Sequence, residues 1–449
     1  MRRAASHLVS DGHSTPSDIV VAMLAAGQAT RTRLSRDQIT GFWAAWMGWT
    51  LDGMDSFIYA LVLAPALTEL LPKSGIAATP GTVAQAGAVL FALFLVGWGL
   101  SSCWGPVADR FGRTRVLAAT VFVYAAFTGI AAVAQSVWQL ALFRLLAGIG
   151  IGGEWALAGT YLAEAWPEDR RAMGAGYLQT GYYAGFFLAA ALNYTVGVHF
   201  GWRAMFLCGL APVLLAWVIT ARVREPDRWQ KARSVARRVQ PFREIFDPEY
   251  RLRTLVNAGL LTVAIVGLWA AAVYEPTAII ALAKKAGLTQ QESIRMASFG
   301  TGWLSLGTMV GCLALPPLAQ RFGRRPVLAF YFLGMGVTIA LGFGVLFYRP
   351  AALHPFLAML FVLGFFGGNF TMFSLWLPEQ YATRVRATAF AFATSIGRFV
   401  GAGVNFLLGW LVARTGTLGI PVACTAIAFV LGLALLPMSL ETRGRPLPE

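Results

Sequence analysis

Two carboxyl side chains lie inside an apolar stretch near the start of the chain. Asp52 and Asp55 are three positions apart, so they share one face of a helix. Counted from Thr40 at 1.5 Å per residue, they lie roughly 18 and 22 Å along the stretch, near and just beyond the middle of a bilayer. Ionised groups at that depth need a cationic partner or water. Both residues could therefore bind and release a proton.

Arg144 and Glu154 lie in another apolar stretch, ten positions apart. That separation is a helical rise of about 15 Å, which puts Arg144 near the level of Asp55. A carboxylate that gains and loses an arginine partner changes how readily it holds a proton. Asp55 and Arg144 are therefore either a proton-coupling pair or a permanent salt bridge. Asp52 is a second proton site or a helix-packing acceptor, and Glu154 carries a proton, binds a polar substrate group or bonds to a neighbouring helix.

Arg398 lies roughly 18 Å beyond Arg386 in a further apolar stretch. Its planar guanidinium matches a carboxylate in a bidentate way, so it indicates binding of an organic anion. The alternative is an internal ion pair with Glu275 or Glu379. Four more residues are weaker candidates for lining a binding cavity: Gln179, Tyr183, Asn369 and Trp376.

The elements that must position these groups are apolar runs of about 20 residues, long enough to cross a bilayer. Of the 449 residues, 57% are hydrophobic and 13% charged, whereas a soluble protein carries about 25% charged residues. Lipid offers no partner to an unpaired backbone group, so we expect an all-α membrane protein. The sequence predicts twelve transmembrane helices: 41–69, 84–107, 116–134, 138–165, 173–197, 202–221, 254–283, 293–319, 327–347, 354–378, 387–412 and 418–439.

The net charge of +15 is concentrated in alternate loops. Cytoplasmic loops of membrane proteins collect Lys and Arg, so this distribution sets orientation, with both termini cytoplasmic, and does not indicate a nucleic acid partner. No secretory signal is apparent. The predicted layout is an N-terminal tail (1–39), a six-helix half (40–221), a basic linker (222–253), a second six-helix half (254–440) and a C-terminal tail (441–449).

The two halves contain matching segments in the same order. Asp109-Arg110-Phe-Gly112-Arg113 corresponds to Gln320-Arg321-Phe-Gly323-Arg324. Further matches are Gly152-Gly-Glu154-Trp with Gly367-Gly-Asn369-Phe, Glu164 with Glu379, and Arg171 with Arg386. Several matches in order indicate a duplication, and parallel repeats of six helices are a transporter architecture with its site between the halves.

These segments resemble the major facilitator superfamily over essentially all of residues 40–445. Gly105-Pro-Val-Ala-Asp109-Arg110-Phe-Gly112-Arg113 is similar to its loop 2–3 signature, and Arg144 through Glu154 to its span 4 motif. Asp52-Gly-Met-Asp55 and Gly-Gly-Glu154-Trp look most like the sialate/lactate:proton symporters, with aromatic-acid:proton symporters close behind. The resemblance implies that Asp55 and Arg144 couple protons. It also implies a cytoplasmic gate formed by Gly105, Asp109, Arg110, Gly112, Arg113, Glu164, Arg171, Arg321, Gly323, Arg324, Glu379 and Arg386.

The sequence therefore predicts a secondary transporter of the cell membrane, working as a monomer in lipid, that takes up a small organic anion with protons. A monocarboxylate or sugar acid such as lactate or sialate is the first expectation and an aromatic acid or other metabolite the second. A drug exporter and a non-transporting membrane sensor are further alternatives. We expect no enzyme activity, no cofactor and no metal, since no hydrolase triad, nucleotide motif or metal-ligand spacing is present, and the four cysteines lie in apolar runs.

Overall fold

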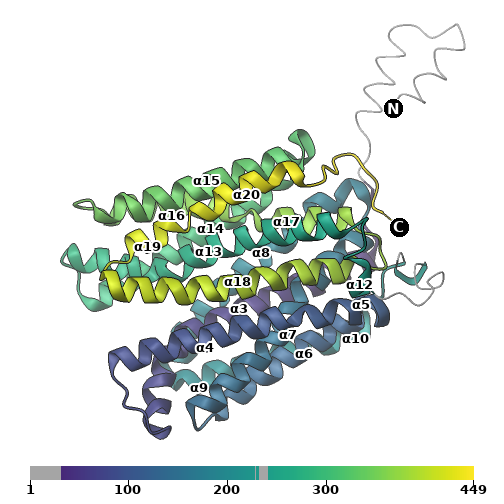
Figure 1. Cartoon of the computed structure of the whole chain (residues 1–449). Helices are drawn as coiled ribbons and strands as arrows, with labels where there is room; N and C mark the ends of the chain where they lie inside the picture. The colour runs from purple at the N-terminus through teal and green to yellow at the C-terminus, as the bar shows by residue number, and fades with distance from the viewer. Residues whose placement is uncertain (1–31, 228, 232–240, 449) are drawn as a thin grey trace, which may run out of the picture.

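The computed structural model describes residues 32–227, 229–231 and 241–448, so most of the predicted N-terminal tail and part of the linker lie outside the described residues. The described residues form helices that run side by side along one common direction (Figure 1). In that view the late helices α15 (Arg324–Gly344), α16 (Leu353–Gly367), α19 (Gly419–Cys424) and α20 (Ile427–Leu435) lie above the early helices α4 (Pro80–Leu100), α6 (Arg113–Ile130) and α9 (Val198–Cys208).

The remaining helices fill the middle of the bundle or complete its two groups. In the first half of the chain they are α3 (Arg36–Lys73), α5 (Trp104–Phe111), α7 (Val137–Ala165), α8 (Glu168–Leu192) and α10 (Pro212–Arg222). The linker contains the single turn α12 (Pro241–Glu244). In the second half they are α13 (Arg251–Lys285), α14 (Gln290–Phe322), α17 (Phe370–Trp376) and α18 (Arg386–Thr415). The two groups meet where α8 packs on α14 and where α18 packs on α4, α5 and α7.

Among the described residues, nine helices are long and apolar enough to cross a membrane, some of them continuous over two labelled segments. A tenth span results if α3, which bends by 62° between Leu63 and Pro65, is counted as one. Helices α8 and α13, with 25 and 35 residues, are not in this set. The all-helical membrane fold is confirmed, whereas the count of twelve spans stays a prediction.

A matching turn joins two helices in each half. Gly112 links α5 to α6 with φ of 117°, and Gly323 links α14 to α15 with φ of 101°. Only glycine adopts such values without strain, which explains why the duplicated basic turn keeps its glycine.

Neither α6 nor α15 receives a hydrogen bond from its own N-cap side chain. The carboxylate of Glu225, which follows α10, accepts hydrogen bonds from the backbone N–H groups of Arg113 (2.7 Å) and Thr114 (3.0 Å). In the second half Glu441, which follows α20, accepts from those of Arg324 (3.1 Å) and Arg325 (3.0 Å). Each half therefore places a negative charge at the positive end of a helix dipole.

Glu441 gives this anchor a pH dependence. Burial raises the pKa of its carboxyl, but hydrogen bonds from the backbone N–H groups of Arg325, Arg324 and Arg443 outweigh burial and leave the pKa below its usual value. A carboxyl with a lowered pKa in the folded state stabilises the fold above its unfolded pKa, and that contribution is lost as the pH falls.

Neutralising Glu441 should therefore destabilise the protein at neutral pH. We expect Glu441→Gln and Glu225→Gln each to lower the free energy of unfolding by about 1 kcal/mol, the size of a helix-terminus charge. Thermal unfolding in detergent measures the effect. For Glu441→Gln the difference from wild type should shrink once the pH falls below the ordinary glutamate pKa, about 4.3. The control is Glu249→Gln in the exposed linker, and equal midpoints for Glu441→Gln and this control would contradict the anchor.

Candidate functional site

The structure brings Asp55 of α3 and Arg144 of α7 together. Both side chains are fully buried, and Oδ2 of Asp55 lies 3.6 Å from Nη1 of Arg144. This distance is an ion pair but exceeds hydrogen-bond length. Arg144 donates a hydrogen bond to Thr128 (3.1 Å) and lies over the rings of Tyr59 and Phe206, at 5.0 and 4.8 Å from their centroids. The guanidinium of Arg144 therefore keeps other contacts when the Asp55 carboxylate moves away from it.

Asp52 and Glu154 are also fully buried, one on α3 and the other on α7. Within the part of the chain that the structure describes, none of their four carboxylate oxygens has a hydrogen-bond partner. Burying an ionised carboxylate without a partner is strongly unfavourable. A permanent packing role for either residue, the alternative left open by the sequence, would require a hydrogen bond that is not made in this conformation.

Arg398 lies at the contact between the two groups of helices. Its guanidinium carbon is 3.7 Å from the ring centroid of Trp98 on α4, and its Nη1 donates to the carbonyl of Thr394 (3.3 Å). Among the described residues it forms no ion pair, because Glu275 accepts from Thr301 and Glu379 pairs with Arg324. Arg398 is thus a buried cation, 2% exposed, that lacks a carboxylate in this conformation. No local pattern in the sequence marked Trp98.

Of the four weaker candidates, Gln179 and Tyr183 lie on α8 and are buried between the groups of helices. Gln179 accepts from Ser374 of α17 (3.4 Å), which itself accepts from the indole N–H of Trp155 (2.9 Å). The ring centroid of Trp155 also lies 5.9 Å from the guanidinium carbon of Arg398. This series of hydrogen bonds therefore connects Gln179 to the surroundings of Arg398.

Asn369 and Trp376 have other surroundings. Asn369 begins α17 and donates to the carbonyl of Phe366 (2.9 Å). Trp376 donates to the carbonyl of Leu440, beyond the end of α20 (2.9 Å). The indole N–H of Trp376 is therefore bonded to the segment that ends the second half, and a role of this residue in the substrate site stays a prediction.

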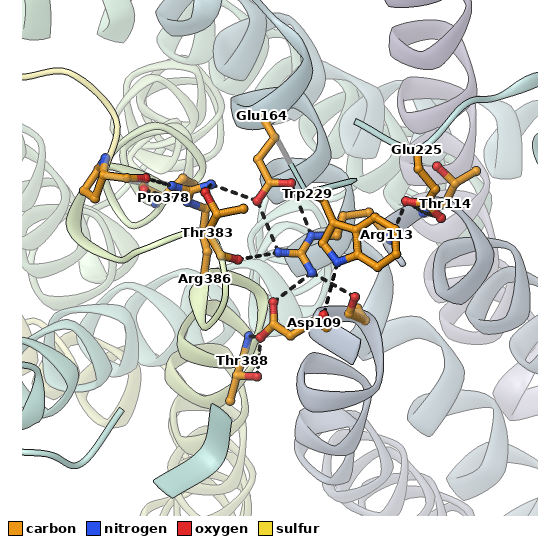
Figure 2. Close-up of polar contacts among 12 residues, drawn as sticks. Asp109, Arg113, Thr114, Glu164, Glu225, Trp229, Pro378, Thr383, Arg386 and Thr388 are labelled. Atoms are coloured by element: carbon orange, nitrogen blue, oxygen red, sulfur yellow. Dashed lines mark hydrogen bonds and ion pairs between the residues drawn. The ribbon is translucent and has the colours of Figure 1, made fainter. Parts of the chain in front are cut away.

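Most of the predicted gate residues lie together at the end of the bundle where α20 ends. We call Asp109, Arg113, Glu164, Arg386 and Thr388 the gate cluster (Figure 2). Glu164 of α7 pairs with Arg113 of the first half (3.2 Å) and with Arg386 of the second (2.8 Å), and all three side chains are fully buried. One carboxylate therefore holds cations from both halves.

Asp109 makes the second link across the gate cluster. Its carboxylate pairs with Arg113 (2.9 Å) and accepts from the backbone N–H of Thr388 (2.9 Å) and from its hydroxyl (Figure 2). Thr388 lies in the first turn of α18, so a helix dipole again meets a carboxylate. A methyl group at Gly105 would lie 2.6 Å from the Cα atom of Thr388, which shows how closely α5 and α18 approach. The two groups of helices are in contact here, so this end of the bundle is closed.

The C-terminal segment also reaches the gate cluster. The carbonyl of Pro448 accepts from Arg386 (2.7 Å), and the backbone N–H of Leu447 donates to Glu168 (3.4 Å) at the start of α8. These contacts join segments far apart in the chain, and no motif pointed to them.

The corresponding residues of the second half form a local network. Arg324 pairs with Glu379 (2.7 Å) and donates to the carbonyl of Ala319, as Arg113 does to Ala108. The other predicted gate residues lie outside both networks: exposed Arg110 and Arg321 each lie over the next phenylalanine ring, at 5.3 Å, and Arg171 pairs with Glu168 at 3.7 Å.

A family model described as the Major Facilitator Superfamily matches residues 45–404. The chain belongs to the major facilitator superfamily. It is therefore a membrane transporter and not an enzyme, an integral multi-pass protein of the cell membrane. The fold agrees, because the proton:xylose symporter XylE superposes with a TM-score of 0.76 over 91% of this chain and 97% of that one. At 18% identity this likeness shows the fold alone.

Two curated relatives from this superfamily fit the resemblance seen in the sequence. A "Probable 4-methylmuconolactone transporter" of Cupriavidus pinatubonensis is 29% identical, over 91% of this chain and 92% of its own length. The sialic acid transporter NanX of Escherichia coli is 30% identical over 43% of this chain and 45% of its own length.

Glu164→Gln should open the closed end of this superfamily member. Removing the carboxylate leaves Arg386 buried without an ionic partner, and breaking a buried pair in this way costs about 3–5 kcal/mol. We expect at least a tenfold faster reaction of an impermeant maleimide, added from the gate-cluster side, with a reporter Ala391→Cys in a chain lacking its native cysteines. Ala391 is 1% exposed and faces Gly105.

The matched control is Glu379→Gln, because Glu379 pairs with Arg324 inside the second half. This variant should lower stability and leave maleimide labelling unchanged. Equal labelling of the two variants would show that Glu164 does not hold the gate cluster closed.

Proposed function

We propose that this protein takes up a small organic anion together with protons. The observation that carries the proposal is Arg398, a buried guanidinium at the contact of α18 with α4 that has no ionic partner among the described residues. A carboxylate is the group that completes such a site, because it matches the guanidinium in charge and in bidentate geometry. The sialic acid transporter among the relatives is named for an organic acid.

Proton coupling is assigned to the Asp55–Arg144 pair, with Asp52 and Glu154 as further proton-handling groups. In the proposed cycle Asp55 takes a proton from outside and releases Arg144. The anion binds at Arg398, and the halves 40–221 and 254–440 then rock about it. The gate cluster, which faces the cytoplasm as both termini do, opens during this movement. Uptake of one proton with each monoanion is electroneutral. A second proton adds a net positive charge, so the membrane potential contributes about 2.3 kcal/mol of driving free energy per 100 mV.

The first substrate class is a monocarboxylate or sugar acid such as lactate or sialate. An aromatic acid is the second, and the aromatic rings around Arg398 favour it. Trp98 stacks on the guanidinium and contacts the ring of Trp269 at 6.0 Å, edge to face. A planar ring attached to the carboxylate would pack against such side chains. We further propose twelve spans and a monomeric transporter.

Asp55→Asn should uncouple transport from the proton gradient. The amide cannot release a proton, so uptake of labelled substrate into proteoliposomes against its gradient should be lost while substrate exchange at equal concentrations is retained. The matched control is Asp37→Asn at the exposed start of the same helix, where the carboxylate pairs with Arg224. Undiminished uptake against a gradient by Asp55→Asn would remove this assignment.

Arg398→Gln should weaken binding of the carboxylate substrate at least tenfold, because a hydrogen bond to a charged group contributes about 1.5–3 kcal/mol. The panel is labelled lactate, sialate and an aromatic acid, each tested by binding to the purified protein. Arg414→Gln is the control, since Arg414 lies over Trp410 on the same helix, 4.4 Å from its centroid, but is exposed. Unchanged affinity in Arg398→Gln would exclude the anion site.

A further inference from the structure

The carboxylate of Glu154 lies against α3 at Gly48. A methyl group on Gly48 would be 1.8 Å from Oε1 of Glu154, so the missing side chain leaves the room that this carboxylate occupies. Gly48 and Asp52 are four positions apart on one face of α3, a rise of about 6 Å. Glu154 therefore reaches α3 one turn before Asp52. The charged groups that act on Asp52 are Glu154, Asp55 and Arg398.

Charge balance disfavours two ionised carboxylates at this place. Asp52, Asp55 and Glu154 are fully buried, and the guanidinium groups near them are those of Arg144 and Arg398. Arg144 is engaged with Asp55, which leaves Arg398 as the one cation acting on Asp52. Neighbouring buried carboxylates lower their mutual repulsion by holding one proton between them.

Tyr124 of α6 also lies near this site. Its side chain is fully buried, its hydroxyl has no hydrogen-bond partner among the described residues, and the charge of Glu154 acts on it. A methyl group on Gly150, one turn before Glu154, would lie 2.5 Å from the backbone nitrogen of Tyr124, so α6 and α7 touch at this level. A phenol hydroxyl donates to a carboxylate. Two further ionisable groups that interact with Asp52 are Tyr182 of α8 and Arg398 of α18.

We propose that Asp52 and Glu154 hold one proton between them and form a second proton-binding site, separate from Asp55 and one helical turn closer to the start of α3. The inference rests on the proposed proton-coupled function. One of the two carboxyl groups carries the proton, and its neutral form removes the repulsion between the two negative charges. Release of the proton leaves both groups ionised, which the site tolerates only while Arg398 faces Asp52.

This arrangement links the proton to the substrate. Arg398 is the shared counter-charge, because it acts on Asp52 and is also the group that the substrate carboxylate would bind. An anion at Arg398 withdraws the positive charge from Asp52, and the pair then takes up its proton. Departure of the anion restores Arg398 to Asp52 and favours release of the proton.

The test is the number of protons taken up per substrate, recorded in proteoliposomes with an internal pH dye. Glu154→Gln and Asp52→Asn should each take up one proton fewer than wild type, and the double variant should lose no more than either single variant. Two independent proton sites would instead give additive losses and overturn the shared proton. Unchanged stoichiometry in both single variants would overturn the site altogether.

Gly48→Ala tests the geometry while keeping both acids. The three atoms nearest to the new methyl group all belong to the carboxyl group of the flexible Glu154 side chain, so we expect the substitution to displace that carboxylate from its place beside α3. We expect the pH of half-maximal substrate-induced proton uptake to fall by about one unit, because each carboxylate favours protonation of its neighbour. Gly403→Ala is the matched control, since a methyl group there meets no atom within 4 Å. A wild-type pH profile for Gly48→Ala would contradict the pair.

The two proposals fail differently. A wild-type protein that transports substrate without proton uptake would refute the proposed proton coupling. The second outcome is that the wild-type protein takes up protons and that both single variants keep its proton stoichiometry and its substrate exchange. This outcome would refute only the Asp52–Glu154 site.

Discussion

The closed state of this transporter depends on one carboxylate that serves two cations. Glu164 binds Arg113 of its own half and Arg386 of the other, with all three side chains removed from solvent. A buried ion pair is favourable only while every charge has a partner. The three charges of Glu164, Arg113 and Arg386 are therefore stable together, and a state that leaves one of them buried without a partner is strongly disfavoured. Opening the gate cluster must separate Arg386 from Glu164. The central charges can then bias this equilibrium, because the two ends of the bundle move together when rigid halves rock about a site.

The buried charges are distributed unevenly over the repeat. Asp52, Asp55 and Glu154 belong to the first half, whereas Arg398 belongs to the second. At the gate cluster Arg113 and Glu164 reach across to the second half. In the second half Arg324 and Glu379 bond to each other, and Glu379 also accepts from the hydroxyl of Thr442. Both halves keep the turn, its glycine and its capping carboxylate. The duplicated features thus maintain each bundle of helices, whereas Arg398 and the Glu164–Arg386 ion pair of the gate cluster, which are not duplicated, lie where the halves face one another.

Sequence reasoning predicted contacts that follow from depth along a helix. Asp55 and Arg144 were paired by counting residues, and the basic turns by their repetition. It missed Trp98 and Pro448, because a stacking ring and a backbone carbonyl carry no local signal. Trp376 was a weak candidate for lining the cavity, and the carbonyl that accepts from its indole could not be predicted from spacing. Spacing along a helix can be predicted from sequence, whereas the neighbour across a helix interface depends on packing that the chain alone does not display.

The capping carboxylates have a consequence for biosynthesis. Glu225 lies 112 positions after Arg113, whose N–H it accepts, and Glu441 lies 117 positions after Arg324. The ribosome therefore makes the start of α6 long before Glu225 emerges, and the start of α15 long before Glu441 emerges. Neither half can complete its bonding until its last helix has been inserted, so each half matures as one block. A truncation that removes Glu441 would leave the second block without its closing contact, even though every spanning helix had been made.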